Sequence, residues 1–178
     1  GVHHDGPKNG IVKLMVNPEK PKAVDGVIMA LEKADIIVLG PGSLYTSIIP
    51  NLLVDGVVDA IKKSNAVKIY VCNIMSQAGE TENYTVSDHL AAIERHSYEG
   101  IADIVIANNA IIPESLRIKY ASEHAREVMI DSINVLKRAK LVQGNLLLVR
   151  NDKIRHNFSR LARTIMRLGS DVNYFENK

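Results

Sequence analysis

Residues 36–47 have the sequence Ile36-Ile37-Val38-Leu39-Gly40-Pro41-Gly42-Ser43-Leu44-Tyr45-Thr46-Ser47. Four apolar residues typical of a buried strand lead into a Gly-Pro-Gly turn and then into hydroxyl-bearing residues. At the carboxyl end of a parallel strand, such a loop lets the backbone approach an anion closely, and a helix start adds partial positive charge. The alternative is an ordinary turn between a strand and a helix, and periodicity alone favours neither reading.

The length and composition around this stretch indicate one core of moderate size. The chain has 178 residues, of which 46% are hydrophobic, enough to bury one sizeable core in one domain. Aromatic residues make up only 4% and Trp is absent, which suits buried parallel strands and argues against a base-stacking surface. The net charge of +2 gives no sign of a nucleic-acid binder.

The sequence also bears on the compartment. No apolar run approaches the roughly 20 residues that span a bilayer, and no signal-peptide pattern is visible. The single Cys72 cannot form an internal disulfide, in agreement with a reducing compartment. We therefore expect a cytoplasmic protein without a membrane span.

Strands and helices are predicted to alternate along the chain. The expected strands are 11–16, 35–39, 67–72, 102–107, a weaker one at 127–130, and 146–150, which would pair with 140–142 across Gln143-Gly144-Asn145. The expected helices are 22–33, 53–63, 86–96 and 155–168, the last one stopped by Gly169. This alternation predicts a doubly wound, mostly parallel, Rossmann-like α/β sheet with helices on both faces and ligands outside the carboxyl ends of its strands.

Three standard motifs are disfavoured for the glycine loop. Tyr45 occupies the third glycine position of the dinucleotide fingerprint, and Asn73 follows the next strand where an acidic residue would hold a ribose. A Walker loop fails because no Gly-Lys-Ser/Thr follows. Ser43 is not in a nucleophile elbow, because Pro41 and Tyr45 replace the flanking glycines. A generic phosphate-binding loop remains.

A second polar loop, residues 73–81, follows the strand expected at 67–72. In a parallel sheet it lies on the same edge as the glycine loop. Asn73 and Gln77 offer amides and Glu80 offers a carboxylate, which could reach a sugar or a base. An ordinary solvated loop is the alternative, but two polar loops at adjacent strand ends favour a binding site.

The histidines and the start of the helix at 86–96 favour structural roles. Thr85 and Asp88 fit a capping box. His89 and His96 lie about 10 Å apart along a helix and cannot share a metal ion. For His89 a structural role is favoured, and a hydrogen bond to a ligand is the weaker alternative. The terminal His3-His4-Asp5 is not expected to form a structural metal site, and no metal site is predicted elsewhere.

The last helix carries two stripes, an apolar one of Phe158, Leu161, Ala162 and Ile165 and a basic one of Arg160, Arg163 and Arg167. A solvated face is the default interpretation of the basic stripe. An anion-binding or partner-facing role stays open.

Taken together, residues 40–54 resemble the signature of the YvcK family, the bacterial gluconeogenesis factors, which are related to the CofD enzymes that transfer phospho-lactate to a deazaflavin. Three further segments agree with the resemblance: 70–75 with Gly79-Glu80-Thr81, then Asp88-His89, then Ile154-Arg155-His156. The matches keep their order and span roughly 22–168. Family members are longer and begin with another strand and glycine-rich loop, so the chain is either a single domain, 1–178, or the carboxyl-terminal portion of a larger one.

The resemblance implies a cytoplasmic protein needed for carbon-source-dependent growth and normal cell shape, with a pocket for nucleotide sugars such as UDP-N-acetylglucosamine. The resemblance suggests a UDP-sugar or another nucleotide as the ligand and implies no certain cofactor. The implied ligand-binding residues are Gly40, Pro41, Gly42, Ser43, Leu44, Tyr45 and Ser47 for the phosphates, and Asn73, Gln77, Gly79, Glu80 and Thr81 lining the site, with His89 as the weaker candidate above.

The leading hypothesis is a non-catalytic, nucleotide-sugar-binding regulatory protein that links carbon metabolism to cell-wall synthesis. The alternative is a CofD-like transferase that moves a phosphorylated small acid from a nucleotide donor to an acceptor, which usually needs a divalent metal and positioned carboxylates. A third reading is an interaction module that uses the basic stripe. We expect the protein to bind a nucleotide ligand and not a nucleic acid. Whether it forms a homo-oligomer stays open.

Overall fold

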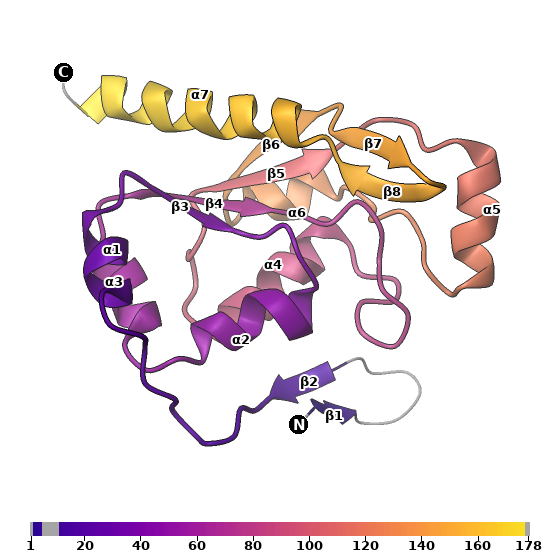
Figure 1. The fold of residues 1–178 in the computed structure, drawn as a ribbon. Coiled ribbons are helices and arrows are strands. Elements are labelled where there is room, and N and C mark those ends of the chain that lie inside the picture. The colour runs from indigo at the N-terminus through magenta and orange to yellow at the C-terminus, as the bar shows by residue number, and fades with distance from the viewer. Residues whose placement is uncertain (1, 5–10, 177–178) are drawn as a thin grey trace.

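A computed structural model of the chain describes residues 2–4 and 11–176 (Figure 1). In chain order its elements are β1 (Val2–His4), β2 (Ile11–Leu14), α1 (Val27–Lys33), β3 (Ile36–Leu39), a π-helical turn (Leu44–Ile48), α2 (Ile49–Leu52), α3 (Val57–Lys63), β4 (Val67–Val71), α4 (Val86–Arg95), β5 (Ile104–Asn108), α5 (Glu114–Ser122), α6 (Ser132–Leu136), β6 (Lys140–Gly144), β7 (Leu147–Arg150), β8 (Lys153–His156) and α7 (Phe158–Glu176). Across the described part of the chain, no helix combines the length and the apolar character that a membrane crossing requires.

The central element is a four-stranded parallel sheet in the order β3-β4-β5-β6. Ile36 pairs with Val67 at the start of β3 and β4, and Ile69 pairs with Ile104 between β4 and β5. Because all four strands run in the same direction, their carboxyl ends meet at one edge of the sheet. The prediction of a mostly parallel α/β fold with helices on both faces is confirmed.

Strand alternation divides the core into two layers. Val67, Ile69 and Val71 of β4 face α7 and pack with Leu161 and Leu168. Tyr70 and Cys72 point to the opposite face, which α4 covers with residues such as Leu90. Figure 1 shows α7 above the sheet and α2 and α4 below it. A strand buried on both faces needs apolar residues at every position, which explains the continuous apolar sequence of β4.

The last helix differs from the prediction. Arg155 belongs to strand β8, and α7 begins at Phe158 and passes through Gly169 instead of stopping there. A Cβ atom at position 169 would overlap the side chain of Ile36, so this glycine permits close packing of α7 against β3. Gly169 is therefore a packing residue and not a helix terminator.

The predicted hairpin between 140–142 and 146–150 is wrong. Strand β6 joins the parallel sheet beside β5, with Ile104 opposite Lys140. Strand β7 pairs instead with β8, where Leu147 lies opposite His156. The turn-like Gln143-Gly144-Asn145 therefore connects two different sheets.

Other expectations need smaller corrections. The segment 127–130 forms no strand and makes only isolated bridges, Met75 with Glu127 and Thr85 with Met129. Strand β2 is shorter than the predicted 11–16 and pairs antiparallel with β1 in a separate hairpin. Helix α1 starts at Val27 and not at Lys22. Helices α5 and α6 were not predicted.

Candidate functional site

A cleft of about 440 Å³ lies where three chain segments meet at the carboxyl edge of the sheet. One wall is the loop after β3, a second is the segment after β4, and the third is the end of β8 with a contact from α5. The lining residues are Pro41, Gly42, Ser43, Asn73, Ile74, Met75, Ser76, Gln77, Tyr120, Ile154, Arg155 and His156. We call this space the loop cleft.

The loop after β3 depends on its glycines. Gly40 has a φ of +85°, and a Cβ there would lie 3.0 Å from the carbonyl oxygen of Val71. A Cβ on Gly42 would lie 3.2 Å from the Cβ of Ser47. Position 40 therefore requires glycine both for its left-handed backbone and for its closeness to β4. The same closeness brings the loop against the start of the second wall.

Two hydrogen bonds tie the three walls together. The side-chain amide of Asn73 donates to the carbonyl of Gly42 at 2.8 Å. The imidazole Nε2 of His156 lies 3.2 Å from the carbonyl of Cys72, 84 positions away in sequence. Because a carbonyl only accepts, the His156 nitrogen donates this bond, and in the neutral imidazole Nδ1 is left as an acceptor. These bonds fix the relative positions of the two loops and β8.

A small apolar cluster holds the β7–β8 hairpin over the cleft. Ile154 of β8 packs with Ile74, Ile112 and Leu116, and its backbone N–H donates to the hydroxyl of Tyr120 at 3.0 Å. Figure 1 shows the hairpin between α7 and α5 at this end of the molecule. The next residue, Arg155, is thereby placed at the cleft. These contacts of Ile154 fix the position of this part of the wall.

Arg155 is the only cation among the residues lining the loop cleft. Its Nη1 donates to the carbonyl of Ile154 at 3.0 Å, which orients the guanidinium. The ion pairs found among the described residues are Arg117–Glu114 and Arg138–Glu94, so Arg155 has no carboxylate partner there. The guanidinium can therefore offer its remaining N–H groups to an anion.

Two further groups set the polarity of the cleft. Burial lowers the pKa of His156 below its ordinary 6.5, although its hydrogen bond to Cys72 counteracts part of this effect. The side-chain carbonyl oxygen of Gln77 is buried and has no hydrogen-bond partner among the described residues. The backbone N–H of Gln77 donates to Thr81 Oγ1 at 2.9 Å. A neutral imidazole and an unused acceptor suit a ligand that brings hydroxyl or N–H donors as well as negative charge.

The structure divides the predicted glycine-loop residues. Pro41, Gly42 and Ser43 line the loop cleft. Gly40 and Ser47 line an adjacent groove of about 450 Å³ beside β3 and α1, which also contacts Pro41 and Gly42. The side chains of Leu44 and Tyr45 are fully buried in the core. The Tyr45 hydroxyl lies 2.9 Å from that of Tyr84 and donates to the carbonyl of Ile11 at 3.1 Å.

The second predicted loop is divided in the same way. Asn73 and Gln77 line the loop cleft, while Gly79, Glu80 and Thr81 form the turn beyond it and do not line it. Thr81 is buried and accepts the Gln77 backbone N–H, so it supports the second wall from behind. Gly79 has a φ of +73° and donates its N–H to Glu82.

His89 lies in the core below the sheet. It is fully buried, its Nδ1 lies 2.8 Å from the carbonyl of Thr85, and burial lowers its pKa. Its ring packs edge-on against Tyr84. Thr85 and Asp88 form both bonds of the predicted capping box at the start of α4. The structural reading of these two capping residues is confirmed.

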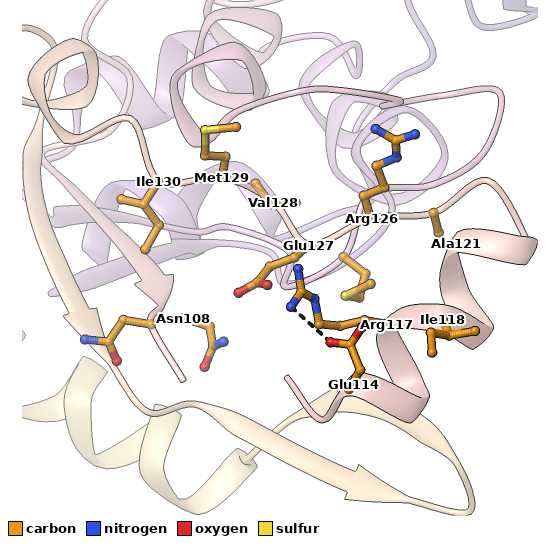
Figure 2. Close-up of a pocket in the computed structure, with 13 residues that line it drawn as sticks. Asn108, Glu114, Arg117, Ile118, Ala121, Arg126, Glu127, Val128, Met129 and Ile130 are labelled. Atoms are coloured by element: carbon orange, nitrogen blue, oxygen red, sulfur yellow. Dashed lines mark hydrogen bonds and ion pairs between the residues drawn. The ribbon is translucent and has the colours of Figure 1, made fainter. Parts of the chain in front are cut away.

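A second cleft of about 730 Å³ adjoins the first and shares Met75 with it (Figure 2). It lies between the end of β5, helix α5 and the segment 125–130. Figure 2 shows Glu127 and the Arg117–Glu114 ion pair pointing into this space, while Arg126 points away from it. Its charged side chains pair or balance one another, so it offers less net attraction to an anion than the loop cleft.

Sequence reasoning missed Arg155, His156 and Tyr120 as members of one cleft. Arg155 and His156 belong to a segment that supports the family resemblance but predicts no role for them, and Tyr120 lies on a helix that was not predicted. The signal that could have found them is the polar Arg155-His156 directly after the apolar Ile154 at the end of a short strand. Placing that strand at the sheet edge required tertiary contacts 84 residues apart.

The loop cleft has a restricted chemical inventory. No aspartate or glutamate is among its described lining residues. Within residues 2–4 and 11–176, no group of three His, Cys, Asp or Glu side chains is placed to hold a metal ion. Asp5 of the terminal His3-His4-Asp5 lies outside the described residues. The arrangement can bind an anion with one guanidinium, hydroxyl and amide groups and a glycine backbone.

Comparisons with known proteins agree with this fold. The model of the family described as 2-phospho-L-lactate transferase CofD matches residues 2–160. A gluconeogenesis factor from Halalkalibacterium halodurans is 42% identical over 164 residues, which cover 90% of this chain and 51% of that protein. The gluconeogenesis factor of Bacillus subtilis is 38% identical over 160 residues, covering 89% of this chain and 50% of that protein.

A solved structure gives the same result. The crystal structure of a UPF0052 family member from Bacillus halodurans superposes with a TM-score of 0.85 at 40% identity, covering 89% of this chain and 52% of that one. The chain thus spans about half the length of the relatives it matches. On the family match and these similarities, the chain belongs to the CofD family and is similar to gluconeogenesis factors.

Proposed function

We propose that the chain contributes the phosphate-binding part of a nucleotide-sugar site in a regulatory protein that links carbon metabolism to cell-wall synthesis and cell shape. The observation that carries the proposal is the loop cleft, in which a glycine loop and the unpaired guanidinium of Arg155 face the same space. The names of the relatives, gluconeogenesis factors, support the metabolic part.

The chemistry of the cleft supports a nucleoside diphosphate sugar as the ligand. A diphosphate accepts hydrogen bonds only, which matches the Arg155 guanidinium and the Ser43 hydroxyl as donors. Sugar hydroxyls can donate to the unused carbonyl oxygen of Gln77. A volume of about 440 Å³ is within the range of roughly 300–1,000 Å³ that is usual for small-molecule sites.

We assign the proposed regulatory role to proteins of the length of the relatives that the chain matches. Since the chain spans about half of those relatives, we propose that the remainder of such a protein adds further contacts to the ligand. A cytoplasmic location and homo-oligomerisation belong to the same proposal. Fractionation of cells and sedimentation analysis of the purified protein test these two parts.

Calorimetric titration with UDP-N-acetylglucosamine tests the proposed ligand. We expect saturable binding, and we expect Arg155→Gln to weaken it by about tenfold to a hundredfold, because a hydrogen bond to a charged group is worth about 1.5–3 kcal/mol. Arg117→Gln is the matched control, since it removes the same charge from the neighbouring cleft. Absence of heat with the wild-type chain, or equal losses in both variants, would contradict the proposal.

The CofD-like transferase is the second candidate, favoured by the description of the matching family model. Phosphoryl-group transfer usually relies on a divalent metal held by carboxylates, and no described residue lining the loop cleft supplies one. The two candidates differ in turnover. Metal-dependent release of a nucleoside monophosphate from a donor of the phosphorylated acid would favour the transferase, and binding without release would favour the regulatory protein.

A further inference from the structure

A separate cleft of about 550 Å³ lies between α7 and the end of β6. Arg160, Arg163 and Arg167 line it from the helix, and Gly144 and Asn145 line it from the strand end. It has no lining residue in common with the loop cleft. We call it the arginine cleft, and we propose that it binds a small phosphate anion carrying several charges.

The region around the arginine cleft carries an excess of positive charge. Residues 137–178 contain ten Lys or Arg residues and three acidic residues, whereas residues 1–136 contain 12 basic and 17 acidic residues. The near-neutral net charge of the chain therefore conceals a strongly basic carboxyl-terminal part. Such a local excess raises the concentration of anions near the surface.

Among the described side chains, no carboxylate neutralises the three arginines. No described carboxylate forms an ion pair with Arg160, Arg163 or Arg167, because the ion pairs found in the described chain involve Arg117 and Arg138. No Asp or Glu lines the arginine cleft. Three guanidinium groups on one side of a helix repel one another, so an anion between them relieves an unfavourable interaction.

Two of the guanidiniums are held in place by backbone carbonyls. Arg160 Nη1 donates to the carbonyl of Asn145 at 3.3 Å, across the cleft from α7 to the strand end. Arg163 Nε donates to the carbonyl of Ser159 at 3.2 Å, which leaves both of its terminal amino groups for a ligand. An oriented arginine loses less conformational entropy on binding than a free one. These bonds orient two of the three exposed guanidiniums at the cleft.

The position and size favour a small ligand over a polymer. Gly144 ends β6, so the cleft lies at the same carboxyl edge of the sheet at which α/β proteins bind ligands. Its volume is within the usual range for small molecules. Arginine forks match phosphate oxygens in geometry as well as in charge. Two or more phosphate groups would use all three guanidiniums.

The test is a titration of the isotopically labelled chain with inorganic pyrophosphate, followed by amide chemical shifts. We expect saturable shifts at Asn145 and Thr164, and a loss of affinity of about tenfold or more in Arg163→Gln/Arg167→Gln. Arg117→Gln/Arg126→Gln is the control, because it removes two charges elsewhere and should retain these shifts. Pyrophosphate in the loop cleft is recognised separately by shifts at Gly42 and Asn73.

Three results would overturn the proposal. Shifts confined to Gly42 and Asn73 would place all phosphate binding in the loop cleft. Shifts at Asn145 that do not saturate, or that sodium chloride reproduces at equal ionic strength, would indicate simple screening. Tighter binding of a polyglutamate peptide than of pyrophosphate would indicate a docking surface for an acidic protein instead.

Discussion

The loop cleft and the arginine cleft both lie at the carboxyl edge of one sheet, but they are built from different chemistry. The loop cleft combines one guanidinium, Arg155, with neutral amide, hydroxyl and imidazole groups. The arginine cleft has three guanidiniums and few neutral side chains. Hydrogen bonds join the walls of the first across 31 and 84 positions of sequence, whereas one bond over 15 positions closes the second.

This difference suggests two modes of anion recognition in one fold. Neutral groups in fixed positions discriminate ligands by shape and hydrogen-bonding pattern, so the loop cleft suits a nucleotide sugar. A cluster of like charges discriminates mainly by the charge of the ligand, so the arginine cleft suits any compact anion with several charges. Substitutions, salt and pH should therefore affect the two clefts differently.

The largest effect is expected from a substitution in the glycine loop, at a position next to the loop cleft. Gly40→Ala forces a left-handed backbone on alanine and places its Cβ 3.0 Å from the Val71 carbonyl. We expect unfolding to become easier by about 2–4 kcal/mol, from a strained backbone worth about 1–3 kcal/mol and the added clash. Urea unfolding followed by circular dichroism measures this loss.

Gly79→Ala is the matched control for that prediction. Gly79 also has a positive φ, +73°, but an added Cβ has no neighbour within 4 Å. It should therefore cost only the backbone term, about 1 kcal/mol. Equal losses of stability in the two variants would show that the close approach of the loop to β4 is unimportant. Pyrophosphate binding at Asn145 should be unchanged in both variants.

The sequence predicted the local parts of this architecture well. Strand β4 is recognisable because it is buried on both faces and carries a continuous apolar run, and the start of α4 is recognisable because Thr85 and Asp88 satisfy each other within four residues. The glycine loop follows from the same kind of short-range pattern. In each case the determining contacts lie close together in the sequence or repeat with a fixed period.

The parts that were missed depend on distant contacts. Gln143-Gly144-Asn145 fits a hairpin turn locally, but β6 pairs with β5, 36 positions earlier at the Ile104–Lys140 pair. Helix α5 has Leu116 buried and Ile118 64% exposed, so its apolar residues form no clear stripe. Arg155 reaches the loop cleft only through the β7–β8 hairpin. None of these pairings has a signature within a short window of sequence.

The two clefts should also differ in how strongly salt weakens ligand binding, and we expect this difference to be smaller than the effect of Gly40→Ala. Raising ionic strength from about 0.1 M to about 1 M shortens the Debye length from about 10 Å to about 3 Å. Pyrophosphate bound by three guanidiniums should lose affinity more steeply than UDP-N-acetylglucosamine bound with one. Calorimetry across this range measures both slopes. Equal slopes would contradict the division into charge-based and shape-based recognition.

The smallest effect concerns the pH dependence of stability and the loop-cleft residue His156. Burial holds the pKa of His156 below its ordinary 6.5 in the folded chain, so the unfolded chain binds a proton first as the pH falls. The contribution of His156 to stability is therefore fully present above pH 6.5 and declines as the pH falls toward its folded pKa. His89 acts in the same direction.

His156→Gln tests this pH dependence. Glutamine can still donate to the Cys72 carbonyl but does not titrate. We expect the difference in urea midpoint between neutral and mildly acidic buffer to become smaller in the variant, while midpoints at neutral pH stay close. An unchanged difference would show that His156 is not responsible, and a larger one would contradict the sign of the pKa shift.

The central claim is that the loop cleft holds the phosphates of a nucleotide sugar, and a crystal structure of the chain with UDP-N-acetylglucosamine tests it most directly. We predict the diphosphate within hydrogen-bonding distance of the Arg155 guanidinium and against the backbone of Gly42 and Ser43. A nucleotide seated in the arginine cleft, or in the neighbouring cleft of Glu127 and Arg117, with the loop cleft empty, would contradict the account.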